Sequence, residues 1–328
     1  MLRPPVLPDA AVTWSPSVTL VPTHGCFNQC GYCSFRVSPE LAVPLTVEQA
    51  QQHLSQRPAA AEVLLLSGEE APGSPGRSAW FARLLHFSQL ALHQGRLPHT
   101  NAGPLSSREM ARLGRCNPSL GLMLEGLGPA YVPLHAHAPS KRLEVRVAQL
   151  EQAGRLGIPF TTGLLLGVGE TRASRIEALE LLRDLQLRWG HVQEVILQPW
   201  RPDGVSAVAL SSEEQADLLE LIAVARELLP PEVHLQTPPN LWPLAALPSA
   251  LAAGIDDLGG IDLADVINPA YPQPTIGELQ AVVEASGRQL RPRTCVHRRW
   301  WQRLPIALRT RVERIDQKLQ QRWATAAC

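Results

Sequence analysis

The chain has 328 residues, of which 45% are hydrophobic and 18% charged, and this composition indicates a globular protein with a sizeable core. Lys and Arg number 30, as do Asp and Glu, so no net charge favours a nucleic-acid or anionic-membrane partner. No apolar run is long enough to span a membrane, and the start, Met-Leu-Arg-Pro-Pro, lacks the pattern of a signal peptide. We therefore expect a cytoplasmic protein that acts on small molecules.

Strand and helix patterns alternate along the chain. The expected strands cover residues 17–21, 62–67, 96–101, 119–125, 160–167, 194–198, 233–237 and 254–257. The expected helices cover residues 44–54, 78–93, 106–113, 142–156, 172–189 and 212–229. Strands that alternate with helices form parallel sheets, and eight such strands predict a closed (β/α)8 barrel of the TIM type.

Three cysteines follow the first expected strand within eight residues: Cys26, Cys30 and Cys33. A closed zinc site needs four ligands, and no second cysteine pair follows, so His24 would have to complete it. Iron–sulfur clusters are normally held by four thiolates, so three would leave one iron open to another ligand. Three unconnected thiols are a further alternative. The other cysteines are scattered and are typical of ordinary thiols in a reducing compartment: Cys116, Cys295 and Cys328.

Polar or special residues stand at the carboxyl end of each expected strand. In a barrel of this type these ends meet at one mouth, where active sites lie. Besides the cysteines, the residues are Glu69, Asn101, Glu125, Glu170, Gln198 with Arg201, Asn240, and Asp256 with Asp257. Each of them alone could be a helix cap, a turn former or a solvated loop residue. Eight strand ends in succession predict a functional site at the mouth.

The cysteine spacing, with Tyr32 before the last cysteine, resembles the signature of the radical S-adenosylmethionine (SAM) enzymes. The resemblance implies that Cys26, Cys30 and Cys33 hold a 4Fe-4S cluster whose open iron binds SAM, which is cleaved to a hydrogen-abstracting deoxyadenosyl radical. It also implies cofactor contacts at the elements that match the family's SAM-binding strand ends. These contacts are Tyr32, Gly68, Glu69, Asn101, Glu125, Gly163, Gly167 and Glu170.

Longer stretches resemble a narrower family, the first subunit of the synthases of 7,8-didemethyl-8-hydroxy-5-deazariboflavin (FO), the deazaflavin core of coenzyme F420. The stretches are 97–101, 121–125, 157–163, 169–172, 191–196 and 254–260. The resemblance implies a carbon–nitrogen lyase that closes the deazaflavin ring of a hydroxybenzyl-ribityl-aminouracil adduct and releases ammonia. It implies as partners this adduct, the second subunit of the synthase and a low-potential electron donor.

The substrate side of the mouth is assigned by hypothesis to Gln198, Arg201, Asn240, Asp256 and Asp257, because uracil and ribityl groups need several directional hydrogen bonds. Three alternatives stay open: the second synthase subunit, another radical SAM enzyme such as one of the biotin-synthase type, and a non-enzymatic zinc-binding scaffold. His99, His135 and His137 have no further ligand at a suitable spacing, so no second metal is expected.

The tail differs from the barrel region in composition. We expect one barrel domain over residues 1–291 and a basic, amphipathic helical extension over residues 292–328. The extension would pack on the barrel with a solvated basic face. Its sharper interpretation is a docking surface for the second subunit.

Overall fold

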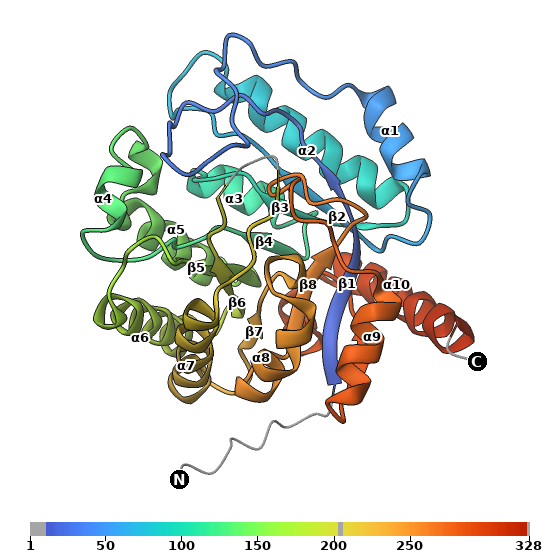
Figure 1. The fold of residues 1–328 in the computed structure, drawn as a ribbon. Helices are drawn as coiled ribbons and strands as arrows, with labels where there is room; N and C mark the ends of the chain where they lie inside the picture. The colour runs from blue at the N-terminus through green and yellow to red at the C-terminus, as the bar shows by residue number, and fades with distance from the viewer. Residues whose placement is uncertain (1–10, 203–205, 327–328) are drawn as a thin grey trace.

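The computed structural model describes residues 11–202 and 206–326 (Figure 1). The chain start with Met-Leu-Arg-Pro-Pro, residues 203–205 and Cys328 lie outside the described residues. Among the described residues, eight parallel strands close into a barrel because β1 pairs with both β8 and β2, and a ninth strand pairs with β1. The strands are β1 (Ala11–Leu20), β2 (Glu62–Leu66), β3 (Leu97–Asn101), β4 (Ser119–Gly121), β5 (Phe160–Leu166), β6 (Val192–Pro199), β7 (His234–Gln236), β8 (Asp257–Ile261) and β9 (Gln289–Pro292). The predicted (β/α)8 barrel is confirmed.

Helices follow the strands and surround the barrel (Figure 1). The α-helices are α1 (Val47–Ser55), α2 (Arg77–His93), α3 (Ser107–Leu113), α4 (Tyr131–Leu134), α5 (Leu143–Arg155), α6 (Arg172–Trp189), α7 (Ser212–Leu228), α8 (Leu247–Ala253), α9 (Ile276–Ala285) and α10 (Ile306–Ala326). Short 3-10 turns cover Pro139–Lys141, Pro239–Leu241, Leu244–Ala246 and Arg298–Arg303. No helix of the described residues is both long and apolar enough to cross a membrane.

Local sequence explains where several helices begin. Helices α1, α3, α7 and α9 open with a capping box, in which a Ser or Thr and a Gln or Glu three residues later satisfy each other's backbone N–H groups. The cap of α7 is Ser211, with Glu214 as its partner. Strand β5 reads Phe-Thr-Thr-Gly-Leu-Leu-Leu and is buried at every position, as expected of a parallel strand covered on both faces.

Three strands differ from expectation. Strand β1 begins at Ala11, before the expected residue 17, although its early residues include Thr13, Ser15 and Ser17. Strand β4 ends at Gly121, and beyond it the backbone turns at Glu125, whose φ of 76° is left-handed. The strand expected over 254–257 is wrong because β8 starts at Asp257 and runs through two glycines. The two aspartates expected at its carboxyl end therefore stand at its amino end.

The chain after β9 closes the bottom of the barrel. Arg293 donates its backbone N–H to the Trp14 carbonyl (2.7 Å), and the guanidinium lies buried inside the barrel. Cys295 and Trp300 follow and pack with Leu97 in a separate apolar cluster. Helix α10 then contacts the barrel edge through Trp323, whose ring lies 5.9 Å from that of Trp14. Arg311, Arg314, Lys318 and Arg322 of this helix are exposed.

Candidate active site

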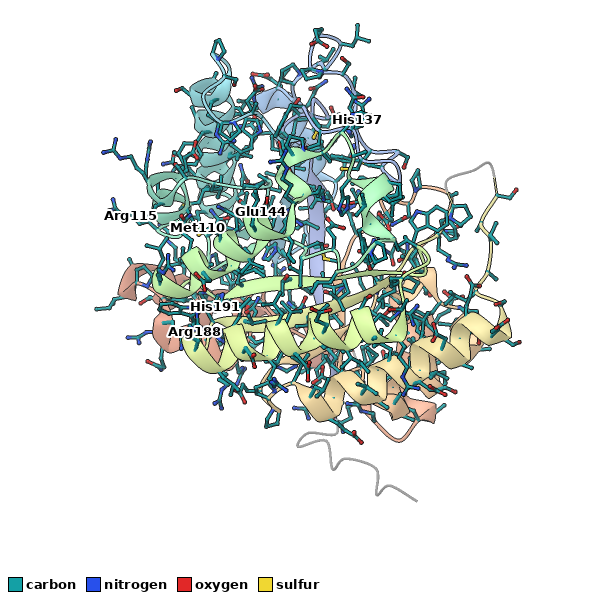
Figure 2. The ribbon with its side chains drawn as sticks, turned by 90° about the vertical axis from the view of Figure 1, so that its left-hand side faces the viewer. Met110, Arg115, His137, Glu144, Arg188 and His191 are labelled. Atoms are coloured by element: carbon teal, nitrogen blue, oxygen red, sulfur yellow. The ribbon has the colours of Figure 1, made fainter. Side chains whose placement is uncertain are left out.

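The cysteine loop is clamped from two sides. Phe27 N–H donates to the carbonyl of Glu69 (3.0 Å), which ties the loop to the end of β2. Gln29 N–H donates to His137 (2.8 Å) and Gly31 N–H to Leu134 (2.8 Å), so the segment after β4 supports the other side. Figure 2 shows His137 on this segment, above helix α5. Two strand ends distant in sequence thereby fix the conformation of the loop.

The three thiols are not gathered as closely as a single zinc ion would require. Cys26, Cys30 and Cys33 are free and half-buried, and Cys33 lines the main cavity. Among the described residues, the group with three ligand atoms within 4.8 Å of one another does not include them, whereas zinc–thiolate distances of about 2.3 Å would bring sulfurs that close. His24 forms no such group with these sulfurs either; its Nδ1 lies 3.0 Å from the Phe35 carbonyl.

Burial disfavours free thiolates at two of the three cysteines. Burial raises the pKa of Cys26, and it raises the pKa of Cys30 to about 11, although the positive charge of Lys141 opposes the shift at Cys30. A bound metal stabilises thiolates strongly and displaces their protons. The protein environment alone leaves both thiols protonated near neutrality.

Glu69 lies behind the cysteine loop in a dense hydrogen-bond network. Its carboxylate accepts from Asn28 Nδ2 (2.8 Å), from the Ser140 hydroxyl and from Arg146 Nη2 (3.3 Å). The Asn28 amide also lies 3.7 Å from Cys26 Sγ, so this network reaches a cysteine sulfur. Glu69 therefore organises the loop and does not line the main cavity.

Gly68 allows the closest approach between β2 and the cysteine loop. A Cβ at this position would lie 2.2 Å from the Gly25 carbonyl oxygen. We expect Gly68→Ala to lower the free energy of unfolding by about 1–3 kcal/mol through overpacking and to reduce bound iron per chain. Gly277→Ala is the matched control, since a Cβ there meets nothing within 4 Å and helix propensity predicts a gain of about 0.5–1 kcal/mol. Denaturant unfolding and iron analysis measure both; unchanged iron and stability in Gly68→Ala would contradict this role.

A buried ion pair stands between the cysteine loop and the cavity. Lys141 pairs with the carboxylate of Glu125, and its ammonium lies 5.8 Å from the centre of the Tyr32 ring. Burial would raise the pKa of Glu125, but Lys141 and Arg146 outweigh it and lower that pKa. The carboxylate is thus ionised and, together with Lys141, lines the cavity. The Tyr32 hydroxyl is buried without a hydrogen-bond partner among the described residues.

The end of β5 is shaped by glycines and a buried carboxylate. A Cβ at Gly163 would lie 2.4 Å from the Ile196 carbonyl oxygen, so glycine permits the close β5–β6 contact. Glu170 accepts from the N–H groups of Gly167 and Val168 (2.8 Å each) and from Arg175 Nε (2.8 Å). Its carboxylate is therefore occupied in holding this turn, and Glu170 does not line the cavity.

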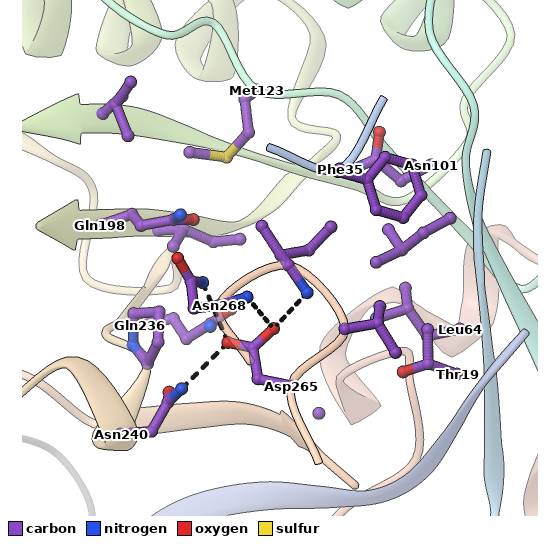
Figure 3. Close-up of a pocket in the computed structure, with 18 of the residues that line it drawn as sticks. Thr19, Phe35, Leu64, Asn101, Met123, Gln198, Gln236, Asn240, Asp265 and Asn268 are labelled. Atoms are coloured by element: carbon purple, nitrogen blue, oxygen red, sulfur yellow. Dashed lines mark hydrogen bonds between the residues drawn. The ribbon is translucent and has the colours of Figure 1, made fainter. Parts of the chain in front are cut away.

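A cavity of about 360 Å³ occupies the barrel mouth, within the size range of small-molecule sites. Its walls differ in character between the two sides. The side towards the cysteines is lined by Tyr32, Cys33, Asn101, Glu125 and Lys141, and the lining also includes the side-chain amides of Gln198, Gln236, Asn240, Asn268 and Gln273. Figure 3 shows Gln198, Gln236, Asn240 and Asn268 on the side of the cavity opposite Asn101. Of the predicted residues, Tyr32, Cys33, Asn101, Glu125, Gln198, Arg201 and Asn240 meet around this one cavity.

Asp265 organises the amide-rich side. Its carboxylate accepts from Asn240 Nδ2 (2.9 Å) and Asn268 Nδ2 (3.0 Å), and from the backbone N–H groups of Ile267 (2.8 Å) and Asn268 (3.0 Å) (Figure 3). The Asn240 amide is fixed by this contact, and its Oδ1 has no donor among the described residues, like Oε1 of Gln273. These carbonyl oxygens are acceptors suited to a ligand with N–H or O–H groups.

Arg201 lines the cavity, but its guanidinium is used by the protein. It donates to the Trp200 carbonyl (2.6 Å) and pairs with Glu214 at the start of α7. The contact joins Arg201 to the start of α7.

Asp256 and Asp257 lie away from the mouth, contrary to the hypothesis that they line the substrate side. Because β8 starts at Asp257, both stand at the barrel floor and neither lines the cavity. Asp256 accepts from the Leu235 N–H (2.8 Å) and contacts His234 Nδ1 (3.1 Å). The residues that follow β8 at the mouth are Asp262 and Asp265.

The floor is a buried charge network. Arg293 donates to Asp257 Oδ1 (2.7 Å) and Glu194 Oε2 (2.7 Å), and His297 Nε2 lies 3.0 Å from the same Glu194 oxygen. Glu194, Asp257 and His297 are close enough to hold a metal ion, but the Arg293 guanidinium already supplies the positive charge between the two carboxylates. The network is an internal ion cluster closed by the C-terminal segment.

Sequence reasoning missed several residues of the site: Lys141, Asp265 and Asn268 at the cavity, and Asn28 and Ser140 in the network of Glu69. Asn28 lies inside the cysteine motif, which was a usable signal. Lys141 is the first cation after Glu125 in the sequence, a weaker signal. Asp265 and Asn268 follow the real end of β8 and were hidden by the shifted strand assignment.

Comparisons with known proteins agree with this geometry. A family model described as the Radical SAM superfamily matches residues 20–182. The chain is 48% identical over 308 residues to a 7,8-didemethyl-8-hydroxy-5-deazariboflavin synthase of Synechococcus elongatus, covering 93% of this chain and 92% of the relative. It is 45% identical over 311 residues to the synthase of that name from Thermosynechococcus vestitus, covering 94% and 99%.

Solved structures share the fold at low identity. The FeFe-hydrogenase maturase HydG from Carboxydothermus hydrogenoformans superimposes with a TM-score of 0.67 at 16% identity, covering 93% of this chain and 77% of that one. Methylornithine synthase (PylB) does so with a TM-score of 0.66 at 17% identity, covering 86% and 84%. The identity to the two synthases extends over nearly the full length of each protein. The chain therefore belongs to the family of radical SAM enzymes that comprises the 7,8-didemethyl-8-hydroxy-5-deazariboflavin synthases.

Proposed function

We propose that this chain is the FO-forming subunit of the synthase. It would convert 5-amino-5-(4-hydroxybenzyl)-6-(D-ribitylimino)-5,6-dihydrouracil into FO with release of ammonia, and 5'-deoxyadenosine and methionine would be the co-products. The observation that carries the proposal is one cavity with Cys33 and Glu125 on one side and a set of amides on the other. A cofactor and a polyhydroxylated uracil derivative could face each other there.

Cys26, Cys30 and Cys33 would hold the 4Fe-4S cluster. When bound, the cluster and SAM supply the hydrogen-abstracting radical, and the protein supplies orientation and exclusion of water. Asn101 and Glu125 are suited to SAM because they line the cavity on the cysteine side. Other predicted cofactor residues would act by shaping the site: Gly68 and Glu69 behind the cysteine loop, and Gly163, Gly167 and Glu170 at the end of β5.

The substrate would lie against the amide-rich side. Gln198 and Asn240 are supported there by Gln236, Asn268 and Gln273, and together they can match the carbonyl, N–H and hydroxyl groups of uracil and ribityl. Arg201 would position the loop after β6 through Glu214.

Asp265 is expected to be a positioning residue for this substrate. Asp265→Ala removes the acceptor of two amides and two backbone N–H groups, so Asn268 loses its side-chain acceptor and Asn240 keeps only the Tyr271 carbonyl. A substrate held in a slightly wrong position can react about a hundredfold more slowly, and we expect kcat/KM for FO formation to fall by about that factor. SAM affinity should stay unchanged. Steady-state kinetics measure the effect, with the exposed Asp184→Ala as control; an unchanged kcat/KM in Asp265→Ala would refute the positioning role.

The second subunit of the synthase is the nearest alternative function. Products formed from the preformed adduct and from tyrosine plus ribityl-aminouracil, identified by mass spectrometry, separate the two. FO from the adduct supports this proposal, and a condensation product from tyrosine supports the alternative. We infer further that the second subunit supplies the adduct and that a low-potential donor supplies the electron.

A further inference from the structure

His99 is a buried histidine for which the proposed function has no role. It lies on β3, between Leu64 of β2 and Ser119 of β4 in the sheet register. The side chain is 7% exposed and lines the cavity below Asn101, which stands two residues further along the same strand. An imidazole ring buried at this depth in a barrel needs a hydrogen-bond partner for each nitrogen, either from the protein or from a ligand.

The tautomer of His99 is fixed by its neighbours. The Ser119 hydroxyl donates to the Cys295 carbonyl (2.7 Å), which can only accept, so the single hydroxyl proton is used there. His99 Nδ1 lies 2.7 Å from the same hydroxyl oxygen and must therefore carry the proton that it donates. Burial, aided by the positive charge of Arg293, lowers the pKa of His99 to about 3, so the ring is neutral. A neutral imidazole with a proton on Nδ1 has a free lone pair on Nε2.

The free nitrogen faces the cavity at a glycine. A Cβ at Gly121 would lie 2.7 Å from Nε2, so the absent side chain leaves the nitrogen uncovered. No described residue forms a hydrogen bond with Nε2, and it is not among the polar atoms sealed from solvent. The cavity walls nearby include Leu64, Met123 and Ile196. His99 Nε2 is thus a neutral acceptor beside aliphatic side chains, and the charged floor residues Glu194 and Arg293 line the same cavity.

We propose that His99 Nε2 accepts a hydrogen bond from the phenolic hydroxyl of the substrate's hydroxybenzyl group. A phenol combines a flat apolar ring with one O–H donor, and this matches one acceptor among aliphatic side chains beside a glycine. The uracil and ribityl groups, with many donors and acceptors, match the amides on the opposite side of the cavity. The inference rests on the proposed function, because the phenol belongs to that substrate. Ser119 is the positioning residue that holds the tautomer.

Binding without turnover tests the contact. Reconstituted, SAM-loaded enzyme without reductant is titrated by calorimetry with the adduct and with its benzyl analogue, which lacks the phenolic oxygen. The benzyl analogue would leave the buried Nε2 without a hydrogen-bond donor, which lowers its affinity. We therefore expect the wild type to bind the adduct about tenfold more tightly than the analogue. In His99→Leu the preference should fall to nearly one, while the matched control His86→Gln, on the exposed side of α2, keeps it. Equal binding of both ligands by the wild type, or a preference retained in His99→Leu, overturns the proposal.

A second measurement keeps this test independent of folding defects and of the proposed function. In anaerobic, ¹⁵N-histidine-labelled wild-type holoenzyme, His99 should show protonated Nδ1 and bare Nε2, and 4-methylphenol but not toluene should shift Nε2. In Ser119→Ala the tautomer should become mixed and the preference for phenol smaller. If FO forms but Nε2 does not respond to 4-methylphenol, the His99–phenol contact is refuted and the proposed function is not. If Nε2 responds to 4-methylphenol but no FO forms, only the proposed function is refuted.

Discussion

Cys30→Ala is expected to abolish deoxyadenosine and FO formation. Cys30 is one of three thiols that the loop presents, and residues that only support metal ligands typically cost 10–100-fold when replaced, so removal of a ligand should cost more than about a hundredfold. The reconstituted variant should also lose the brown colour and visible absorbance of a 4Fe-4S cluster. Chromatography of deoxyadenosine and iron analysis measure both effects.

Cys116 provides the matched control for this prediction. It is also half-buried, and its Sγ contacts the Leu113 carbonyl (3.3 Å) away from the cavity. Cys116→Ala should keep iron content and turnover. A Cys30→Ala enzyme with wild-type iron and turnover would show that another group completes the cluster or that no cluster is needed.

Arg293→Met is expected to destabilise the fold strongly. The substitution leaves the buried Asp257 without its guanidinium and removes the donor to Glu194, and breaking a buried pair typically costs about 3–5 kcal/mol. Urea unfolding at neutral pH measures the loss. Arg291→Met, two residues earlier and exposed, should change stability by less than about 0.5 kcal/mol.

The pH dependence gives this prediction a second readout. Burial raises the pKa of Glu194 from 4.5 to about 8 despite the opposing effect of Arg293. The folded state therefore holds a proton that the unfolded state releases, and wild-type stability should fall as pH rises from 4.5 to 8. Without Arg293 the pKa rises further, so the deficit of the variant should widen above pH 8. If the stability difference between Arg293→Met and the wild type is small or does not change with pH, the charge network at the barrel floor does not stabilise the fold.

The sequence predicted strands well where they are continuous apolar runs, as in β2 and β5. It failed where inward-facing residues are polar or small. Strand β1 carries Thr13, Ser15 and Ser17, and β8 runs through Gly259 and Gly260, so neither region has a normal strand pattern over its full length. Polar and small residues of this kind weaken the strand pattern wherever they face the barrel interior.

The site was predicted to the extent that it lies in short sequence motifs or directly at strand ends. Cys33, Asn101, Glu125, Gln198 and Asn240 meet around one cavity, as parallel strand order requires. Contacts made by long loops could not be read from spacing. Lys141 reaches Glu125 from a turn sixteen residues later, and Arg293 reaches Glu194 across 99 residues. Such pairs depend on the path of the backbone, which no local pattern specifies.

The central claim is radical-dependent formation of FO by this chain alone from the adduct. The direct measurement is an anaerobic assay of the reconstituted protein with SAM, a reductant and the adduct, following deoxyadenosine by chromatography and FO by fluorescence. We expect both products to rise together in equal amounts and neither to form without SAM or with Cys30→Ala. Deoxyadenosine that accumulates with the adduct unchanged, or FO that forms without SAM, would contradict the account.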